Sequence, residues 1–170
     1  RFMEPESKQR LRVAVVGART VDAYHLAALK PLDFVDIVAL ADLDTAMANT
    51  LAGRFGVPMV GRTLGDLAGA RPDAVYVLTP PASHCALALQ ALDMGCHVLV
   101  EKPMAESVAE CETMIARAKE KGLVLSVNHS DRLDPVVVKA LGHARAGTCG
   151  DVLSVDVLRS SEYPEYAGGP

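Results

Sequence analysis

Residues 11–20 read LRVAVVGART, and a run of apolar residues rich in valine leads directly into Gly17. The run is nearly continuous rather than alternating, which is typical of a strand buried on both faces of a parallel sheet. A glycine directly after such a strand permits a tight turn into a helix. The segment therefore predicts the first strand and the first turn of a doubly wound α/β domain.

The same pattern recurs along the chain, with helical segments between its copies. Further runs of this apolar character are Val35–Ala41, Ala74–Leu78, His97–Val100 and Leu123–Val127. Strands that alternate with helices over short links are joined by right-handed crossovers, which makes their sheet parallel. We therefore expect a Rossmann-type α/β fold with helices on both faces of the sheet.

Capping residues and apolar periodicity mark the expected helices. The boundary signals are Asp44 and Gly56 for one helix, Ser107, Glu110 and Gly122 for a second, and Gly95 at the end of a third over Ala82–Met94. The apolar faces expected for the first two are Met47, Leu51 and Phe55, and Val108, Cys111, Ile115 and Ala118.

Composition and charge exclude several classes of partner. The 170 residues carry a formal net charge of −4, so no basic surface predicts nucleic-acid binding. No apolar stretch reaches the roughly 18 residues that a membrane span needs. The first residues are charged and lack the apolar core of a signal peptide, so we expect a cytoplasmic protein.

The cysteines do not predict a metal or redox site. The four are Cys85, Cys96, Cys111 and Cys149. They lie far apart, without a CxxC pair and without histidines at metal-ligand spacing. We interpret them as small core residues in a reducing compartment, and we expect no metal.

The pattern changes near the end of the chain. In Val152–Leu158 apolar residues alternate with polar ones, which is typical of a strand with one face in water. We therefore expect a tail over residues 1–10, a dinucleotide-binding domain over 11–148, and over 149–170 the first strand of a second, antiparallel α/β substrate domain that is otherwise missing.

The loop after the first strand departs from the dinucleotide fingerprint. Ligands of open parallel sheets bind beyond the carboxyl ends of the strands, and the fingerprint has glycine at three positions of the first loop. Gly17 satisfies the first position, but Arg19 and Asp22 occupy the other two. Arg19 either obstructs the approach of the pyrophosphate or contacts it through its guanidinium.

Asp42 follows the second strand, 25 positions after Gly17. The fingerprint has an acidic residue about 20 positions on, which accepts hydrogen bonds from the ribose hydroxyls of NAD. A carboxylate there would repel the 2′-phosphate of NADP, so we expect NAD as the cofactor, with NADP disfavoured. The alternative is that Asp42 only helps to start the next helix.

Polar residues also follow the later strands. Thr79 and Pro80 come after the third run and are followed by His84 at a helix start. Glu101, Lys102 and Pro103 come after the fourth run, and Asn128 and His129 after the fifth. Lys102 could steer a hydroxyl or stabilise an alkoxide during hydride transfer. Its alternative role is a surface ion pair with Glu101.

These motifs together resemble the Gfo/Idh/MocA family of oxidoreductases, most specifically over TPPASH (79–84) and GCHVLVEKP (95–103). The resemblance covers residues 11 to about 160. It implies a Rossmann domain followed by a second α/β domain with an open antiparallel sheet. It implies that Lys102 is catalytic and that dinucleotide contacts come from Gly17, Arg19, Asp42, Thr79, Pro80, His84, Glu101, Lys102, Pro103 and Asn128.

The function that this resemblance implies is NAD-dependent oxidation of a secondary alcohol on a sugar, polyol or similar small molecule. Two alternatives stay open: a glycosidase or lyase that uses NAD for transient oxidation, and a non-catalytic dinucleotide- or metabolite-binding module. The expected partners are a small-molecule substrate and further copies of the chain, joined in a homo-oligomer through the missing second domain.

Overall fold

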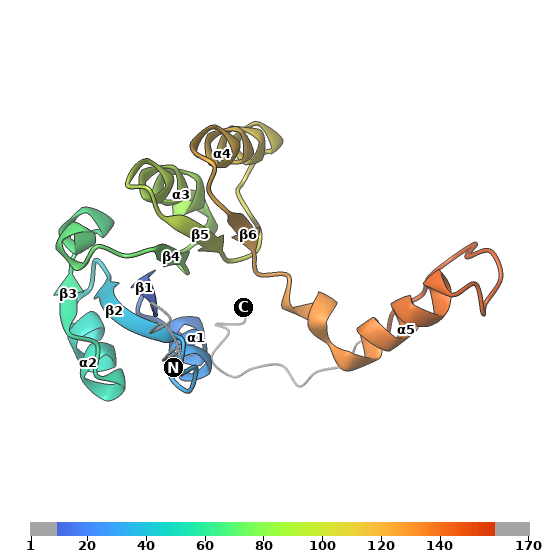
Figure 1. Ribbon diagram of the computed structural model, residues 1–170, viewed down its shortest axis with the longest axis horizontal. Helices are drawn as coiled ribbons and strands as arrows, with labels where there is room; N and C mark the ends of the chain where they lie inside the picture. Colours follow the sequence, from blue (N-terminus) through green and yellow to red (C-terminus); the bar gives the residue numbers. More distant parts are fainter. Residues whose placement is uncertain (1–9, 159–170) are drawn as a thin grey trace, which may run out of the picture. The chain divides into compact units, whose positions relative to one another are not determined.

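The structure is a computed structural model that describes residues 10–158. Within these residues six strands form one parallel sheet in the order β3-β2-β1-β4-β5-β6 (Figure 1). The strands are β1 (Leu11–Val16), β2 (Val35–Ala41), β3 (Met59–Gly61), β4 (Ala74–Val77), β5 (His97–Val100) and β6 (Leu125–Val127). This is the strand order of dinucleotide-binding Rossmann domains, so the predicted fold class is confirmed.

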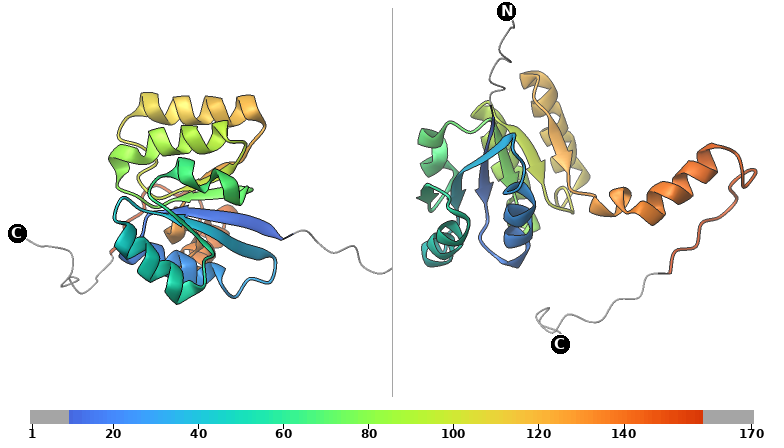
Figure 2. Two further views of the ribbon diagram at one scale, coloured as in Figure 1. Left: turned by 90° about the vertical axis from the view of Figure 1, so that its left-hand side faces the viewer. Right: turned by 60° about the horizontal axis from the view of Figure 1, so that its bottom comes forward.

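Helices cover both faces of the sheet, with α1 and α2 on one face and α3 and α4 on the other (Figures 1 and 2). The α-helices are α1 (Thr20–Leu29), α2 (Thr45–Phe55), α3 (His84–Asp93), α4 (Val108–Lys121) and α5 (Pro135–Arg145). Three shorter 3₁₀ segments are η1 (Leu64–Ala70), η2 (Pro81–Ser83) and η3 (Ser130–Leu133).

Each face of the sheet has its own hydrophobic core. On β1, Val13 and Val15 pack with α1 and α2, whereas Ala14 and Val16 pack with α3 and α4. Successive side chains of a strand point to opposite faces, so a strand between two helical layers must be apolar at every position. The apolar run of β1 is nearly continuous because helices cover both of its faces.

The predicted boundaries agree with the structure where caps or long apolar runs define them. Asp44 caps α2 by accepting hydrogen bonds from the backbone of residues 46 and 47, and Gly56 ends the helix in the left-handed region. Ser107 and Glu110 form the predicted capping box of α4. The short strand β3 was not predicted, because its three residues carry too little pattern.

The predicted apolar faces of two helices are partly wrong. On α2 the buried residues are Ala48, Leu51 and Ala52, while Met47 is exposed. On α4, Met114 and Ala118 are buried, while Val108 and Ile115 are exposed. Small side chains allow these helices to lie close to the sheet, and the apolar pattern in the sequence did not identify which face packs inward. Among the cysteines expected in the core, Cys96 is buried but Cys149 is exposed.

The strand predicted over Val152–Leu158 is also wrong. These residues form no strand, and Leu153 and Leu158 are almost fully exposed. No strand among residues 10–158 pairs with the segment, and a single strand without a partner leaves its backbone groups and its apolar face in water. By contacts the chain divides between His129 and Ser130. The domain boundary predicted between residues 148 and 149 stays a prediction.

Leu26 tests the packing of α1 on the sheet. Its side chain is completely buried in the core shared by α1 and α2. Leu26→Ala should lower the free energy of unfolding by about 2–5 kcal/mol, because the cavity is not refilled. Urea denaturation measures the change. The matched control is Ile115→Ala on α4, where the exposed side chain should contribute less than about 0.5 kcal/mol. Equal losses in the two variants would contradict the packing described here.

Candidate functional site

The residues that follow the strands lie in one row along the carboxyl edge of the sheet. The hydrogen-bond ladder continues one residue past β1, β4, β5 and β6: Gly17 donates to Ala41, Leu78 to Val16, Glu101 to Val77, and Asn128 to Val100. Each of these residues is therefore held beside the end of the neighbouring strand. The row brings together segments that are more than 100 positions apart in the sequence.

The β1 loop is tied to the end of β2 through Asp42. One carboxylate oxygen of Asp42 accepts a hydrogen bond from the Ala18 backbone at 2.8 Å, and the other accepts one from the Asp44 backbone at 2.8 Å. Gly17 has a φ of 122°, a backbone angle that residues with a side chain rarely adopt, so a glycine is required there. Asp42 thus shapes the loop, and its oxygens retain lone pairs for hydroxyl donors.

A pocket of ≈ 580 Å³ lies over this half of the edge. Its size falls within the usual range for small-molecule sites. The polar and charged residues that line it are Arg19, Asp42, Asp44, Arg62, Thr63, Thr79, Ser83 and Gln90, and the apolar ones include Leu43, Pro80 and Leu87. Sequence reasoning identified Arg19, Asp42, Thr79 and Pro80 but missed Arg62, because no helix or fingerprint motif marks the end of β3.

Thr79 keeps acceptor capacity toward this pocket. Ser83 Oγ donates to the Pro80 carbonyl at 2.8 Å, so the 2.6 Å contact between Ser83 Oγ and Thr79 Oγ1 requires Thr79 to be the donor. A hydroxyl that donates inward retains lone pairs on its outer side. Thr79 is therefore prepared to accept a hydrogen bond from a ligand.

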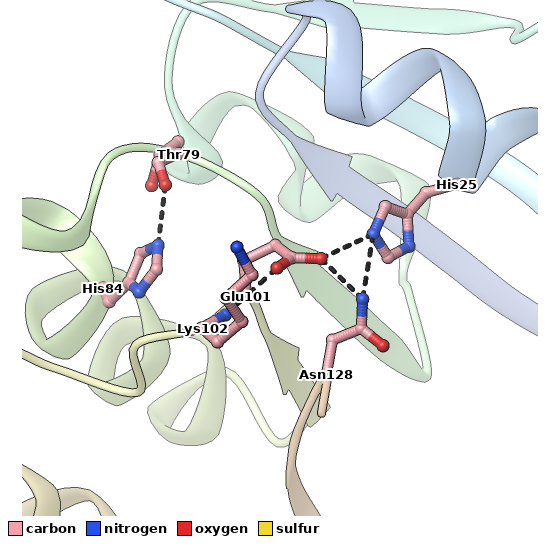
Figure 3. Close-up of polar contacts among 6 residues, drawn as sticks. All are labelled: His25, Thr79, His84, Glu101, Lys102 and Asn128. Carbon is pink, nitrogen blue, oxygen red and sulfur yellow. Dashed lines mark hydrogen bonds and ion pairs between the residues drawn. The ribbon is translucent and has the colours of Figure 1, made fainter. Parts of the chain in front are cut away.

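Three side chains meet at the other half of the edge (Figure 3). His25 Nε2 lies 2.8 Å from Glu101 Oε1, and Asn128 Nδ2 donates to the same oxygen at 2.6 Å. The other oxygen, Oε2, accepts the backbone N–H of Lys102 at 3.1 Å. The side chains of His25 and Glu101 are only 15% and 12% exposed. The Glu101 carboxylate is the centre of this cluster.

The environment of Glu101 favours its charged form. Burial raises the pKa of this carboxyl, but hydrogen bonds from Asn128, His25 and the Lys102 backbone lower it more, and the pKa lies below its ordinary value. The ring of His25 also meets Tyr76 of β4 edge-on, with centroids 5.9 Å apart. Burial raises the pKa of Tyr76, so its hydroxyl stays neutral.

His84 is fully buried and joins two of the edge loops. Its Nε2 lies 2.6 Å from the Thr79 carbonyl oxygen, and its Nδ1 lies 2.8 Å from the Pro103 carbonyl oxygen. The ring thus packs between the loop after β4 and the loop after β5. The predicted contact between His84 and a dinucleotide stays a prediction, and the position of the ring gives it a supporting role in the fold.

Lys102 extends from the loop that His84 and Glu101 hold. Its side chain is exposed, and within residues 10–158 its ammonium makes no hydrogen bond or ion pair. The alternative role considered for it, a surface ion pair with Glu101, is therefore wrong, because the carboxylate binds His25, Asn128 and the Lys102 backbone instead.

Sequence reasoning missed His25. Its partner Glu101 lies 76 positions further along the chain, so spacing gave no indication of the pair. One signal was available: His25 lies four positions before the buried Leu29, on the same side of α1. A polar residue on the buried side of a helix requires a partner, and the row of edge residues supplies it.

The described residues contain no group of three or more His, Cys, Asp or Glu side chains placed to hold a metal ion. In the same part of the chain no helix combines the length and the apolar character that crossing a bilayer requires.

The parallel sheet, its strand order and the polar edge define a nucleotide-binding Rossmann domain. Comparison with known proteins gives the family: residues 11–129 match the family described as "Oxidoreductase family, NAD-binding Rossmann fold". The chain belongs to this family, Gfo/Idh/MocA, as its motifs indicated. It therefore carries the NAD-binding Rossmann domain of this family.

Relatives and solved structures agree with this assignment. The chain is 35% identical over 126 residues to 4-carboxy-2-hydroxymuconate-6-semialdehyde dehydrogenase of a Sphingobium species, covering 74% of this chain and 40% of the relative. It is 33% identical to inositol 2-dehydrogenase 1 of Saccharopolyspora erythraea, covering 85% and 44%. A crystal structure of GenD2 from gentamicin A biosynthesis with NAD matches with a TM-score of 0.79 at 32% identity, covering 86% and 42%. The matched part of the chain thus spans less than half the length of each of these proteins.

Glu101→Gln tests the charge at the centre of the cluster. The variant should lower the free energy of unfolding at pH 7 by about 1–3 kcal/mol, because an amide cannot accept at both positions. The pKa of Glu101 is lowered by folding, so the ionised carboxylate stabilises the fold fully above the unfolded pKa of about 4.3 and loses this effect as the pH falls through the lower folded value. The difference between the two proteins should therefore shrink below about pH 4.3. Urea denaturation across this range measures it, and a constant difference would contradict the assignment.

Proposed function

We propose that this domain belongs to an NAD-dependent oxidoreductase that oxidises a secondary alcohol of a sugar, polyol or similar small molecule. The observation that carries the proposal is the edge itself, where a pocket of ≈ 580 Å³ lies at Asp42 and Lys102, which has no ion-pair partner within residues 10–158, follows β5. The names of the relatives support oxidoreductase chemistry, and inositol 2-dehydrogenase 1 supports a polyol substrate.

The described residues fit NAD. The pocket beside Asp42 offers a carboxylate for ribose hydroxyls and apolar walls from Leu43, Pro80 and Leu87 for a base. Gly17, at the tight turn after β1, brings the backbone of the loop close to the position of a pyrophosphate. We assign the adenosine half to this pocket and the nicotinamide half to the Glu101–Lys102 loop.

Asp42 selects the cofactor in this proposal. Its two oxygens already accept backbone hydrogen bonds, and their remaining lone pairs suit the ribose hydroxyls of NAD. A 2′-phosphate at the same place would meet a like charge. Arg62 lines the same pocket and reduces this repulsion without replacing the hydroxyl acceptor.

Calorimetric titration of the protein with NADH and NADPH tests this role. NADH should bind at least about tenfold more tightly, which corresponds to about 1.4 kcal/mol. Asp42→Asn keeps one acceptor oxygen but removes the charge, so the ratio of the two affinities should fall toward one. Equal or tighter binding of NADPH by the parent protein would refute the role of Asp42.

Lys102 is the residue to which we assign the proton chemistry. NAD supplies the hydride acceptor that no side chain can provide. Glu101 holds the backbone of Lys102, and the Lys102 ammonium makes no hydrogen bond or ion pair within residues 10–158. A cation there donates a hydrogen bond to the substrate oxygen and stabilises the alkoxide that forms when the hydroxyl proton is lost to solvent, before the carbon gives up its hydride.

Lys102→Ala in the full-length protein should lower kcat roughly 100-fold, the range for loss of an acid–base or electrostatic group. The dissociation constant for NADH should change by less than about twofold, because the ammonium acts mainly in the transition state. Lys119→Ala, an exposed lysine of α4, is the matched control. A Lys102→Ala enzyme with near-normal kcat would contradict the assignment.

Three finer inferences belong to the same proposal. The partner is a small-molecule substrate, the protein acts in the cytoplasm, and it forms a homo-oligomer. NADH fluorescence separates the proposal from the alternative of a metabolite-binding module that has lost its cofactor, because such a module would not change the emission.

A further inference from the structure

We propose that His25 is a positioning residue that fixes Lys102 through the Glu101 carboxylate. The inference rests on the proposed function, since it concerns the lysine to which we assign the proton chemistry. His25 belongs to α1, and Glu101 and Lys102 follow β5. Figure 3 shows the imidazole and the Asn128 amide converging on one side of the carboxylate, with the Lys102 backbone on the other.

The two oxygens of Glu101 have different partners. Oε1 accepts from His25 and Asn128, and Oε2 accepts from the backbone N–H of Lys102. Donors on Oε1 fix the rotation of the carboxylate, and that rotation determines where Oε2 lies. The position of the Lys102 backbone therefore depends on the donors at Oε1.

His25 and Asn128 are not interchangeable donors. His25 approaches from α1, whereas Asn128 approaches from the end of β6 (Figure 3). Two donors from different elements restrict a carboxylate to one orientation, while a single donor leaves it free to rotate about that bond. The edge contact with Tyr76 in turn orients the imidazole.

The neighbours of His25 determine that its Nε2 atom carries a proton. Asn128 Nδ2 lies 3.4 Å from Nε2 and 2.6 Å from Glu101 Oε1, so the amide donates to the carboxylate. Nε2 must then carry a proton to hydrogen-bond the same oxygen at 2.8 Å. His25 therefore acts as a largely buried hydrogen-bond donor to the Glu101 carboxylate.

The hydrogen bond between His25 and Glu101 also connects the two halves of the sheet. The strand order reverses between β1 and β4, and α1 belongs to the first half while Glu101 belongs to the second. The loop before α1 is the expected place of the pyrophosphate. His25 thus connects the helix that would bind the phosphates with the loop that carries Lys102.

Two substitutions separate the donor from the bulk of the side chain. His25→Leu removes the donor and keeps an apolar side chain of similar reach. His25→Gln places an amide nitrogen the same number of bonds from Cβ as Nε2, so it restores the donor. Tyr24→Leu changes an exposed neighbour on the same helix and is the matched control.

The first readout is amide hydrogen exchange at Lys102, followed by NMR, and it needs no cofactor or substrate. In His25→Leu the exchange rate of this amide should rise about tenfold, because the acceptor for its N–H becomes mobile. Exchange at Val15 in the centre of the sheet should not change. His25→Gln and Tyr24→Leu should retain the parent rate at Lys102.

The second readout is kinetic and uses the full-length enzyme. In His25→Leu, kcat should fall about tenfold while the dissociation constant for NADH stays within about twofold, and His25→Gln should restore kcat. A loss of folding alone would not give this split, nor its rescue by glutamine.

Unchanged Lys102 exchange in His25→Leu would overturn the inference, and so would a His25→Gln variant as defective as His25→Leu. If His25→Leu does not fold, Glu101→Gln replaces it, and parent-like exchange at Lys102 in that variant overturns the inference. Failure of the proposed function is seen separately, as a parent protein that binds no NADH while the exchange results remain measurable.

Discussion

The backbone hydrogen-bond ladder that runs one residue past β1, β2, β4, β5 and β6 is the constraint on which the site depends. Because the sheet is parallel, the residue after every strand lies at the same edge, and the extra bond fixes the residues after these five strands beside their neighbours. Gly17, Leu78, Glu101 and Asn128 are aligned in this way by backbone hydrogen bonds alone. The side chains of the loops that follow the strands then determine the chemistry of this edge.

Glu101 shows how such an edge can hold a buried charge. A carboxylate that is 12% exposed is costly unless hydrogen bonds replace its hydration. Three donors do so here, from α1, from the loop after β6 and from the next peptide group. Because each donor belongs to a different segment, the carboxylate can only be satisfied when α1, β5 and β6 are all correctly placed.

The sequence allowed the fold and most of the edge to be predicted, for a physical reason. Strands buried on both faces are apolar throughout, and helix caps such as Asp44 and Gly56 have strict chemical requirements, so both leave local patterns. Residues directly after the strands must lie at the edge once the sheet is parallel. Asp42, Thr79 and Glu101 were found in this way.

The remaining features depend on contacts between distant segments. His25 and Glu101 meet only because the His25 side chain extends from α1 to the end of the neighbouring strands, where it also contacts Tyr76 of β4. The pairing leaves no local trace in either segment. The buried face of α4 likewise depends on the shape of the sheet surface that it meets, so Met114 rather than Ile115 lies inward. The alternation in Val152–Leu158 predicted a strand, but a strand forms only beside a partner.

Titration of ¹⁵N-labelled protein with NADH, followed by NMR, tests the central claim that one dinucleotide lies along this edge. The account predicts that the amides of Gly17, Asp42, Thr79 and Glu101 shift together with a single dissociation constant. Amides at the opposite edge of the sheet, such as those of Arg12 and Asp36, should not shift. No shifts at saturating NADH, or shifts confined to the opposite edge, would contradict it.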